Sequence, residues 1–210
     1  MYEEVIFDVE TQKFFDEIEG SDPADLGVSI LSMYVRTLDE NFCEVKGPPA
    51  GEASKMISFF EPDLGKAWEV FKTADRIVGF NSKHFDVPAL KPYLPIELTK
   101  IPHLDILEQV RAVNGKRVSL GAIANGTLGD HKADDPRNAI TYWAKHDEES
   151  LKKLKFYCEE DVRLTKEVYD YGLKNKTLKF KDYWNDIKTI EVDFSYPVIE
   201  KPDEEQTSLF

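Results

Sequence analysis

The chain has 210 residues, enough for one domain with a well-formed core, and its net charge of −13 is unlike that of proteins that grip duplex nucleic acid along its length. Its two cysteines, Cys43 and Cys158, are far apart in sequence, which excludes a disulfide framework and predicts a reducing, cytoplasmic location. No apolar run is long enough to cross a bilayer, so we expect no membrane partner.

The first half of the chain predicts a sheet with short helices. In the opening segment, the apolar residues Val5, Phe7 and Val9 face one way while Asp8 and Glu10 face the other, as in a strand. The pattern then predicts strands at Gly27–Val35 and Asn41–Lys46, an amphipathic helix at Leu64–Thr73, a strand at Arg76–Phe80 and a short helix at Val87–Leu94.

The second half predicts mainly helices. The pattern predicts helices at Leu120–Ala124 (capped by Ser119), Pro136–Lys145 and Glu148–Leu173. It also predicts a strand passing into a helix at Ile101–Val110 and an extended segment at Ile190–Phe194. Strands followed by alternating helices and strands predict a mixed β-sheet flanked by α-helices, in a single α/β domain over residues 1–198. The polar, proline-interrupted residues 199–210 predict a flexible acidic tail.

The first acidic motif lies on the opening strand. Asp8 and Glu10 are two residues apart, so both carboxylates project from the same face. Like charges beside a core strand are unfavourable unless a cation compensates them, and carboxylate oxygens suit Mg²⁺ or Mn²⁺. Taken alone, the pair is better interpreted as two surface acids on a half-exposed strand.

The second motif follows the Arg76–Phe80 strand, where loops often hold functional groups. It contains Asn81, Phe85 and Asp86. An asparagine can hydrogen-bond a sugar or base, and a phenylalanine can stack on a base. The alternative is structural: Asp86 would cap the short helix, Phe85 would be core and Asn81 would serve the turn.

The third motif lies on the long helix. Tyr157 and Asp161 are at positions i and i+4, so they share one face, which borders the inward apolar stripe. A partly buried carboxylate requires a partner, and no basic residue on this face of the helix supplies one, whereas a metal ion would. The alternative is a hydrogen-bonded contact between Asp161 and Tyr157.

Taken together, the three motifs resemble the DEDD superfamily of 3′–5′ exonucleases, which have an RNase H-like fold. The last motif, Tyr-x-x-x-Asp, is similar to the tyrosine (DEDDy) branch, typified by the proofreading domains of family B DNA polymerases and by stand-alone exonucleases of the YprB type. The sibling branch has a histidine five residues before the final aspartate, where this chain has Phe156. The likeness spans roughly residues 3–172 and includes His103–Leu107 and Ser119–Ala124.

The resemblance implies two divalent metal ions, Mg²⁺ or Mn²⁺, as cofactors. By this resemblance Asp8 would bridge both ions, and Glu10 and Asp161 would complete the site that holds the nucleophilic water. Asp86 would hold the second ion from its outer shell, and Tyr157 would position the attacking water. The implied reaction is hydrolytic release of 5′-mononucleotides from a 3′ end.

The resemblance also makes Asn81 and Phe85 candidates for binding the terminal nucleotide. The implied substrate is the 3′ end of a nucleic acid, with single-stranded DNA favoured and RNA left open. An acidic protein can act on such an end through bound metals, or can be delivered by a partner. Lys132 and Arg137 could contact a phosphate, but they are interpreted as ordinary solvated charges.

The last five residues, Gln206 to Phe210, resemble the short peptide by which bacterial replication and repair proteins dock on the sliding clamp. Leu209 and Phe210 would fill an apolar pocket of the clamp, and Gln206 would hydrogen-bond at its edge. Such a tether would raise the local concentration of the enzyme on DNA and place it in replication or repair. The alternative is a hydrophobic terminus folded back on its own domain.

Three functions therefore compete. The first is an active 3′–5′ exonuclease, because all four acids and the tyrosine are present. The second is a non-catalytic module with the same fold that binds nucleic acid or a sliding clamp. The third is a related endonuclease, which would also cut circular substrates.

Overall fold

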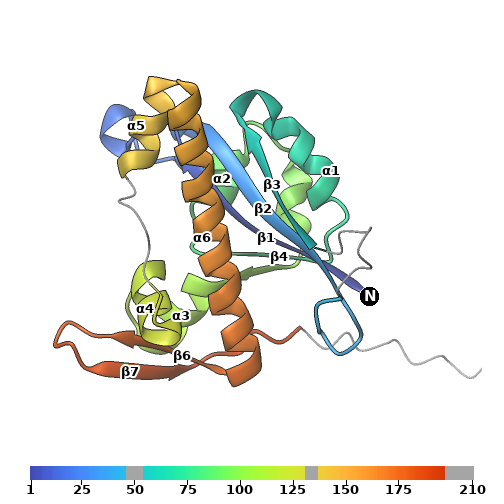
Figure 1. The fold of residues 1–210 in the computed structure, drawn as a ribbon, viewed down its shortest axis with the longest axis vertical. Helices are drawn as coiled ribbons and strands as arrows, with labels where there is room; N and C mark the ends of the chain where they lie inside the picture. Colours follow the sequence, from blue (N-terminus) through green and yellow to red (C-terminus); the bar gives the residue numbers. More distant parts are fainter. Residues whose placement is uncertain (46–53, 131–136, 197–210) are drawn as a thin grey trace, which may run out of the picture.

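The computed structural model describes residues 1–45, 54–130 and 137–196. A five-stranded sheet in the order β3-β2-β1-β4-β5 forms its centre (Figure 1). Pairing is antiparallel between β1, β2 and β3 and parallel between β1, β4 and β5. The predicted mixed sheet is thus confirmed, and its strands are β1 Tyr2–Thr11, β2 Val28–Leu38, β3 Ser54–Phe60, β4 Arg76–Gly79 and β5 His103–Asp105.

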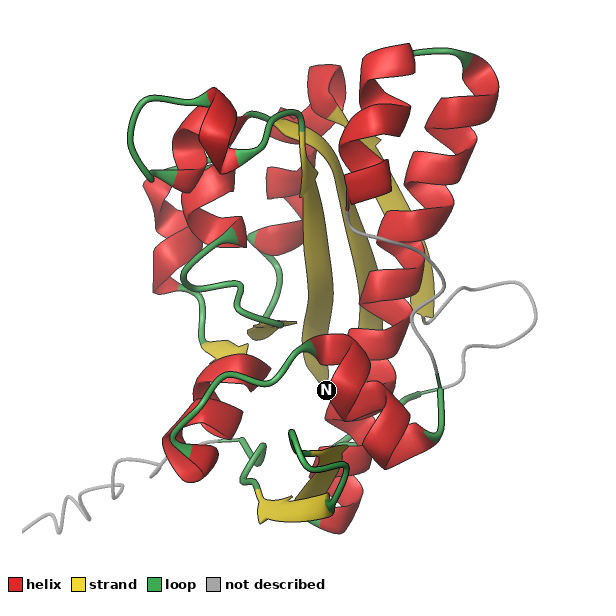
Figure 2. Ribbon diagram, turned by 90° about the vertical axis from the view of Figure 1, so that its left-hand side faces the viewer, coloured by secondary structure: helices red, strands yellow, loops and turns green. Residues whose placement is uncertain are grey.

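Helices lie on both sides of the sheet, as Figure 2 shows. They confirm the predicted α/β architecture. The helices are α1 Trp68–Phe71, α2 Asp86–Leu90, α3 Ile106–Asn114, α4 Leu120–Leu128, α5 Arg137–Lys145 and α6 Glu148–Asn175, with 3₁₀ turns η1 Phe15–Glu17, η2 Pro23–Leu26, η3 Glu61–Ala67 and η4 Ile96–Lys100.

The strand β1 is central in the sheet, with β2 on one edge and β4 on the other, and side chains of both its faces are buried in hydrophobic clusters. Val5, Phe7 and Val9 pack into the cluster that holds α1 and α2. Ile6 packs into the opposite cluster, against α6. Asp8 and Glu10 share the face of Ile6, so the alternation directs both carboxylates towards α6.

The long helix α6 crosses this face of the sheet. It begins after Asp147, whose carboxylate accepts a hydrogen bond from the Ser150 amide at 2.9 Å, and ends at Lys176 in the left-handed conformation. The predicted stripe is buried: Leu154, Cys158, Val162, Thr165 and Tyr169.

The predicted strand at Asn41–Lys46 does not form over residues 41–45, and Lys46 lies outside the described residues. The Asp39 carboxylate accepts hydrogen bonds from the amides of Asn41 at 2.8 Å and Cys43 at 2.9 Å, which closes a turn. Only one isolated bridge, between Glu44 and Leu38, follows among these residues. The third strand is β3 instead.

The segment predicted as one helix at Leu64–Thr73 is also different. It consists of the end of η3 and the single turn α1. The predicted inward residues Leu64, Ala67 and Phe71 are fully buried, and Trp68 is half-buried, so the burial pattern is confirmed although the helix type is not.

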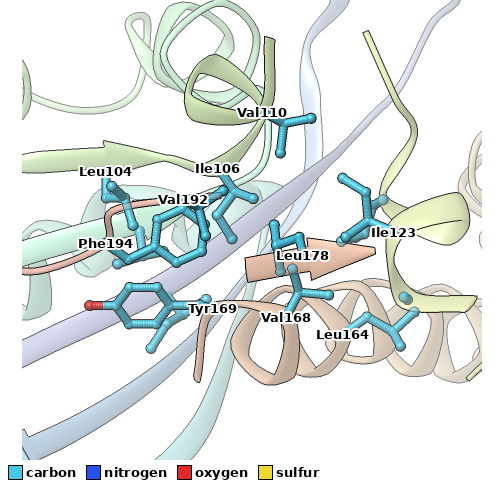
Figure 3. Packing of buried hydrophobic residues seen from close by; sticks show 14 of the residues in the cluster. Leu104, Ile106, Val110, Ile123, Leu164, Val168, Tyr169, Leu178, Val192 and Phe194 are labelled. Carbon is cyan, nitrogen blue, oxygen red and sulfur yellow. The ribbon is translucent and has the colours of Figure 1, made fainter. Parts of the chain in front are cut away.

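A second sheet follows α6, formed by β6 Thr177–Lys181 and β7 Ile187–Glu191. Of this hairpin, the sequence pattern indicated only the extended residues from Ile190 onward. Figure 3 shows how the hairpin and the residues after it contact the body of the protein. Leu178 of β6, together with Val192 and Phe194, packs against Val168 and Tyr169 of α6.

The residues 206–210 that resemble a clamp-binding peptide lie outside the described residues, as does Lys132. The described part of the chain contains no helix that is both long and apolar enough to cross a membrane.

Candidate active site

Three carboxylates converge where α6 crosses β1. Asp8 and Glu10 come from β1 and Asp161 from α6, and one oxygen of each lies within 4.8 Å of the other two. Asp161 is buried, and Asp8 and Glu10 are half-buried. Three acids this close repel one another when ionised, so the arrangement favours a bound cation.

Asp86 lies beside this group. It is the first residue of α2, and its Oδ1 accepts a hydrogen bond at 3.0 Å from the amide of Val9, the residue between the two acids of β1. Burial raises the pKa of Asp86 to about 7, and the charges of Asp105 and Asp161 add to the effect. The fourth predicted acid is thus held against the backbone that presents the first two.

One cavity of about 300 Å³ joins the four acids to Tyr157. Tyr157 is buried and lies one helical turn before Asp161, as its spacing predicted. Phe156, its neighbour, is 61% exposed. The structure therefore brings together all five residues to which the sequence analysis assigned catalytic roles.

An adjoining cavity of about 780 Å³ shares Asp8 and Asp161 with the first. The two residues predicted to bind substrate, Asn81 and Phe85, both line it. Arg117 also lines it, close to the N-terminus of α4. Glu10 and Asp86 line only the first of these cavities, whereas Asn81, His84 and Arg117 line only the second.

The sequence analysis missed an aromatic pair at this site. Phe14 and Phe15 follow β1 after Gln12 and Lys13; Phe15 lines both cavities, and its ring centroid is 6.1 Å from that of Phe85. Two adjacent phenylalanines shortly after an acidic strand motif were the available signal. Arg137, interpreted as a solvated charge, is exposed and also lines the acidic cavity.

The turn that leads to Asp86 is held by a second acid, Asp105. Its carboxylate is buried and accepts hydrogen bonds from the amides of Asn81 at 2.9 Å, Lys83 at 3.0 Å and Glu108 at 3.2 Å. Asn81 takes a left-handed conformation (φ 65°) within this turn. Asp105 therefore fixes both the turn and the start of α3.

His103 contacts the same turn through Ser82. Its Nε2 lies 2.8 Å from the Ser82 hydroxyl, and burial lowers the pKa of His103 to about 4. The imidazole is therefore neutral at pH 7 and has a structural role.

Cys158 lies behind the acidic group. Its Sγ is 3.5 Å from the backbone oxygen of Asp8 and 3.9 Å from that residue's carboxylate. Burial raises the pKa of the thiol well above its usual value, and the charges of Asp8 and Glu10 act in the same direction. Cys158 therefore adds no further negative charge to the group.

The donor set fits a hard divalent cation. All four acidic side chains offer carboxylate oxygens, which are the ligands that Mg²⁺ and Mn²⁺ prefer. The basic residue closest in sequence, Arg163 of α6, pairs instead with Glu160 at 2.9 Å and with Asp130 and Glu167 at 3.0 Å. The basic residues that line the acids' cavity are Lys13 and Arg137.

Comparison with known proteins identifies the superfamily to which this fold belongs. The sequence pattern of the RNase H superfamily matches residues 5–172, which is most of the chain and includes all four acids and Tyr157. No curated protein matches the chain as a whole or in part. Nucleases with the RNase H-like fold use divalent metals, in agreement with the carboxylate group found here. The chain belongs to the RNase H superfamily.

Proposed function

We propose that the protein is a metal-dependent 3′–5′ exonuclease of the tyrosine (DEDDy) branch of the DEDD superfamily. It hydrolyses the phosphodiester bond at a nucleic-acid 3′ end, preferably that of single-stranded DNA, and releases 5′-mononucleotides. The observation that carries the proposal is the cavity that Asp8, Glu10, Asp86, Asp161 and Tyr157 line together.

In this proposal each of the five residues has a distinct role. Asp8, Glu10 and Asp161 would hold the cations, Asp8 would serve both of them, and Asp86 would contribute from beside the group. When bound, two divalent cations supply activation of the attacking water and stabilisation of the entering and leaving oxygens. Tyr157 orients that water from the neighbouring turn of α6.

Burial on α6 supports the tyrosine branch. In the sibling branch the catalytic histidine stands five residues before the last aspartate, a position that in this chain is the largely exposed Phe156. Tyr157 is buried and faces the acids' cavity. The Tyr-x-x-x-Asp spacing of Tyr157 and Asp161 is also the basis of the similarity to proofreading domains of family B polymerases and to YprB-type exonucleases.

Asn81 and Phe85 bind the terminal nucleotide in this proposal, and Phe15 adds a second aromatic surface beside Phe85. Bases stack on such rings without regard to sequence. Arg137 and Arg117 offer positive charge for the phosphates on the two sides of the acids.

The decisive experiment is a timed digestion of 5′-labelled single-stranded DNA and RNA with Mn²⁺. The wild-type protein is expected to yield a shrinking ladder, which Asp8→Ala should slow by at least about 100-fold, because removal of one electrostatic stabiliser typically costs that much. Asp63→Ala, which removes an exposed acid of η3, is the matched control and should digest normally.

Other results would decide against the proposal. Retained hydrolysis in Asp8→Ala would refute the site assignment, and cutting of circular DNA would indicate an endonuclease. Binding without any metal-dependent product would indicate the non-catalytic module.

We also propose that the chain divides into a catalytic domain over residues 1–198 and a tail over 199–210 that binds a sliding clamp through Gln206, Leu209 and Phe210. The support for this is the sequence of the terminal peptide. Its consequence would be a role in DNA replication or repair.

A further inference from the structure

Asp8, Ser32 and Ser58 form a row across three neighbouring strands. Asp8 of β1 is directly opposite Ser32 of β2, and Ser32 is directly opposite Ser58 of β3. Residues directly opposite each other in antiparallel strands have their side chains on the same face of the sheet. The row therefore lies on the face that carries the Asp8 carboxylate, which is the face that α6 crosses (Figure 1).

The two serines of this row are hydrogen-bonded to each other and to α6. The hydroxyl oxygens of Ser32 and Ser58 are 3.0 Å apart, and the Ser58 hydroxyl donates to the Glu159 carboxylate of α6 at 2.7 Å. Because Ser58 uses its one hydroxyl proton for Glu159, Ser32 is the donor between the two serines. The turn of α6 that contains Glu159 is thus attached to both β3 and β2.

Cys158, the residue before Glu159, attaches the same turn of α6 to β1. It is fully buried, and its Sγ lies within hydrogen-bonding distance of Asp8 at two atoms, the backbone oxygen at 3.5 Å and the carboxylate Oδ2 at 3.9 Å. A thiol is a weak donor, but a carboxylate is a charged acceptor, which strengthens such a bond. Cys158 therefore contacts both the main chain and the side chain of Asp8.

These contacts join the two halves of the candidate active site. Asp8 and Glu10 come from β1, whereas Tyr157 and Asp161 come from α6, and Cys158 lies between the latter two in sequence. The position of one half relative to the other depends on how α6 packs on the sheet. Apolar packing is non-directional, whereas hydrogen bonds have a preferred distance and angle. The polar contacts of this turn can therefore set an orientation that the surrounding apolar side chains cannot.

A residue that hydrogen-bonds a metal ligand affects metal binding without touching the metal. It fixes the orientation of the ligand, and its loss typically lowers the affinity for the metal about 10- to 100-fold. Asp8 is the acid that would serve both cations in the proposed function. A change in the orientation of Asp8 would therefore weaken both positions at once.

We propose that Cys158 is a positioning residue for the metal site. Its thiol holds the Asp8 carboxylate in the orientation in which it shares a cation with Asp161. The row formed by Ser32, Ser58 and Glu159 holds the turn of α6 that carries this thiol. The alternative is that Cys158 only fills space, in which case another side chain of its size would serve equally well. The inference rests on the proposed function, because that function supplies the cation.

The test measures the affinity for Mn²⁺ in the absence of nucleic acid, from the electron paramagnetic resonance signal of free Mn²⁺. Cys158→Ala is expected to bind Mn²⁺ about 10-fold more weakly than the wild-type protein. Cys158→Ser has nearly the same volume as the alanine variant but retains a donor, so its affinity should stay within about 3-fold of wild type. Asp8→Ala gives the affinity that remains when the ligand itself is absent.

Two further positions separate orientation from stability. Val168→Ala is the matched control, because Val168 is fully buried on α6 about two turns beyond Asp161. It should lower the urea midpoint and leave the Mn²⁺ affinity unchanged. Ser58→Ala breaks the row at a half-buried site and should weaken Mn²⁺ binding by less than Cys158→Ala does. Ser58→Thr, which restores a hydroxyl at this strand position, should recover the affinity.

The outcomes separate this inference from the proposed function. Equal Mn²⁺ affinity in the wild type and in both Cys158 variants would refute the positioning role. Equal losses in Cys158→Ala and Cys158→Ser would show that Cys158 only fills space, and a wild-type affinity that does not depend on Asp8 would also refute the inference. Affinities in the expected order, in a protein that hydrolyses no nucleic acid, would support the positioning role and refute the exonuclease alone.

Discussion

Replacing Asp105 by alanine tests how the turn that holds Asp86 is maintained. The buried carboxylate accepts three backbone hydrogen bonds, two from the Asn81–Asp86 turn and one from Glu108 at the start of α3. In Asp105→Ala the amides of Asn81 and Lys83 lose their acceptor, and α3 loses its cap. Asp86, to which we assign a role in metal binding, is five residues beyond the start of this turn.

The expected cost follows from these bonds. Each hydrogen bond from these part-buried amides to the charged carboxylate contributes about 1.5–3 kcal/mol, and loss of a helix cap costs about 1 kcal/mol. Water that enters the space left by the side chain offsets part of this, so we expect a loss of about 3 kcal/mol in the free energy of unfolding. For a protein of this size, that corresponds to a fall in Tm of about 6–12 °C.

The assay is urea unfolding followed by circular dichroism, together with the rate of DNA digestion at 15 °C, where both proteins are folded. A displaced Asp86 should reduce the rate by at least about 10-fold, because small errors in position are costly in catalysis. Asp147→Ala is the matched control: it removes the cap of α6 and should cost about 1 kcal/mol with an unchanged rate. If Asp105→Ala resembles Asp147→Ala in both measurements, the turn does not depend on Asp105.

Two further predictions concern stability. Because burial lowers the pKa of His103 to about 4, the unfolded chain binds a proton between about pH 6.5 and pH 4 that the folded protein does not. The free energy of unfolding should therefore decrease as the pH is lowered from about 6.5 to 4. The contribution of this group is on the order of 3 kcal/mol. His103→Asn should lack that part of the slope in urea midpoints measured from pH 7 to 4; equal slopes would contradict the assignment. Gly126→Ala should cost about 1–3 kcal/mol in the same assay, because the new Cβ would lie 2.5 Å from the Phe180 Cα. Gly65→Ala, with its nearest neighbour at 4.0 Å, is the control, and equal losses in the two variants would show that α4 and β6 can separate without cost.

Much of the site was predictable because its signals are local. The alternation of β1 places Asp8 and Glu10 on one face, and the helical spacing of α6 places Tyr157 and Asp161 together. Both patterns depend on backbone geometry that a few neighbouring residues determine. The mixed sheet was predictable for the same reason, from the order of its elements.

Of the remaining errors, the first has a local cause, and the others depend on residues distant in sequence. The Asn41–Lys46 segment has strand-like residues, but the Asp39 carboxylate closes a turn there, and β3 pairs with β2 instead. The positions of Phe15 and Arg137 on the cavity walls depend on how η1 and α5 pack, which no local pattern records.

Glu4 shows most clearly what only the tertiary structure decided. It stands on β1 where the alternation gives no special role, yet it is fully buried. Its carboxylate accepts hydrogen bonds from Arg36 at 2.9 Å, Tyr169 at 2.6 Å and Tyr196 at 2.5 Å. A buried charge is stable only with such partners, and these come from β2, from α6 and from the segment after β7. The sequence by itself determined which residues form the acidic face of β1, whereas the folded chain decided that Glu4 is buried among partners from β2, α6 and the segment after β7.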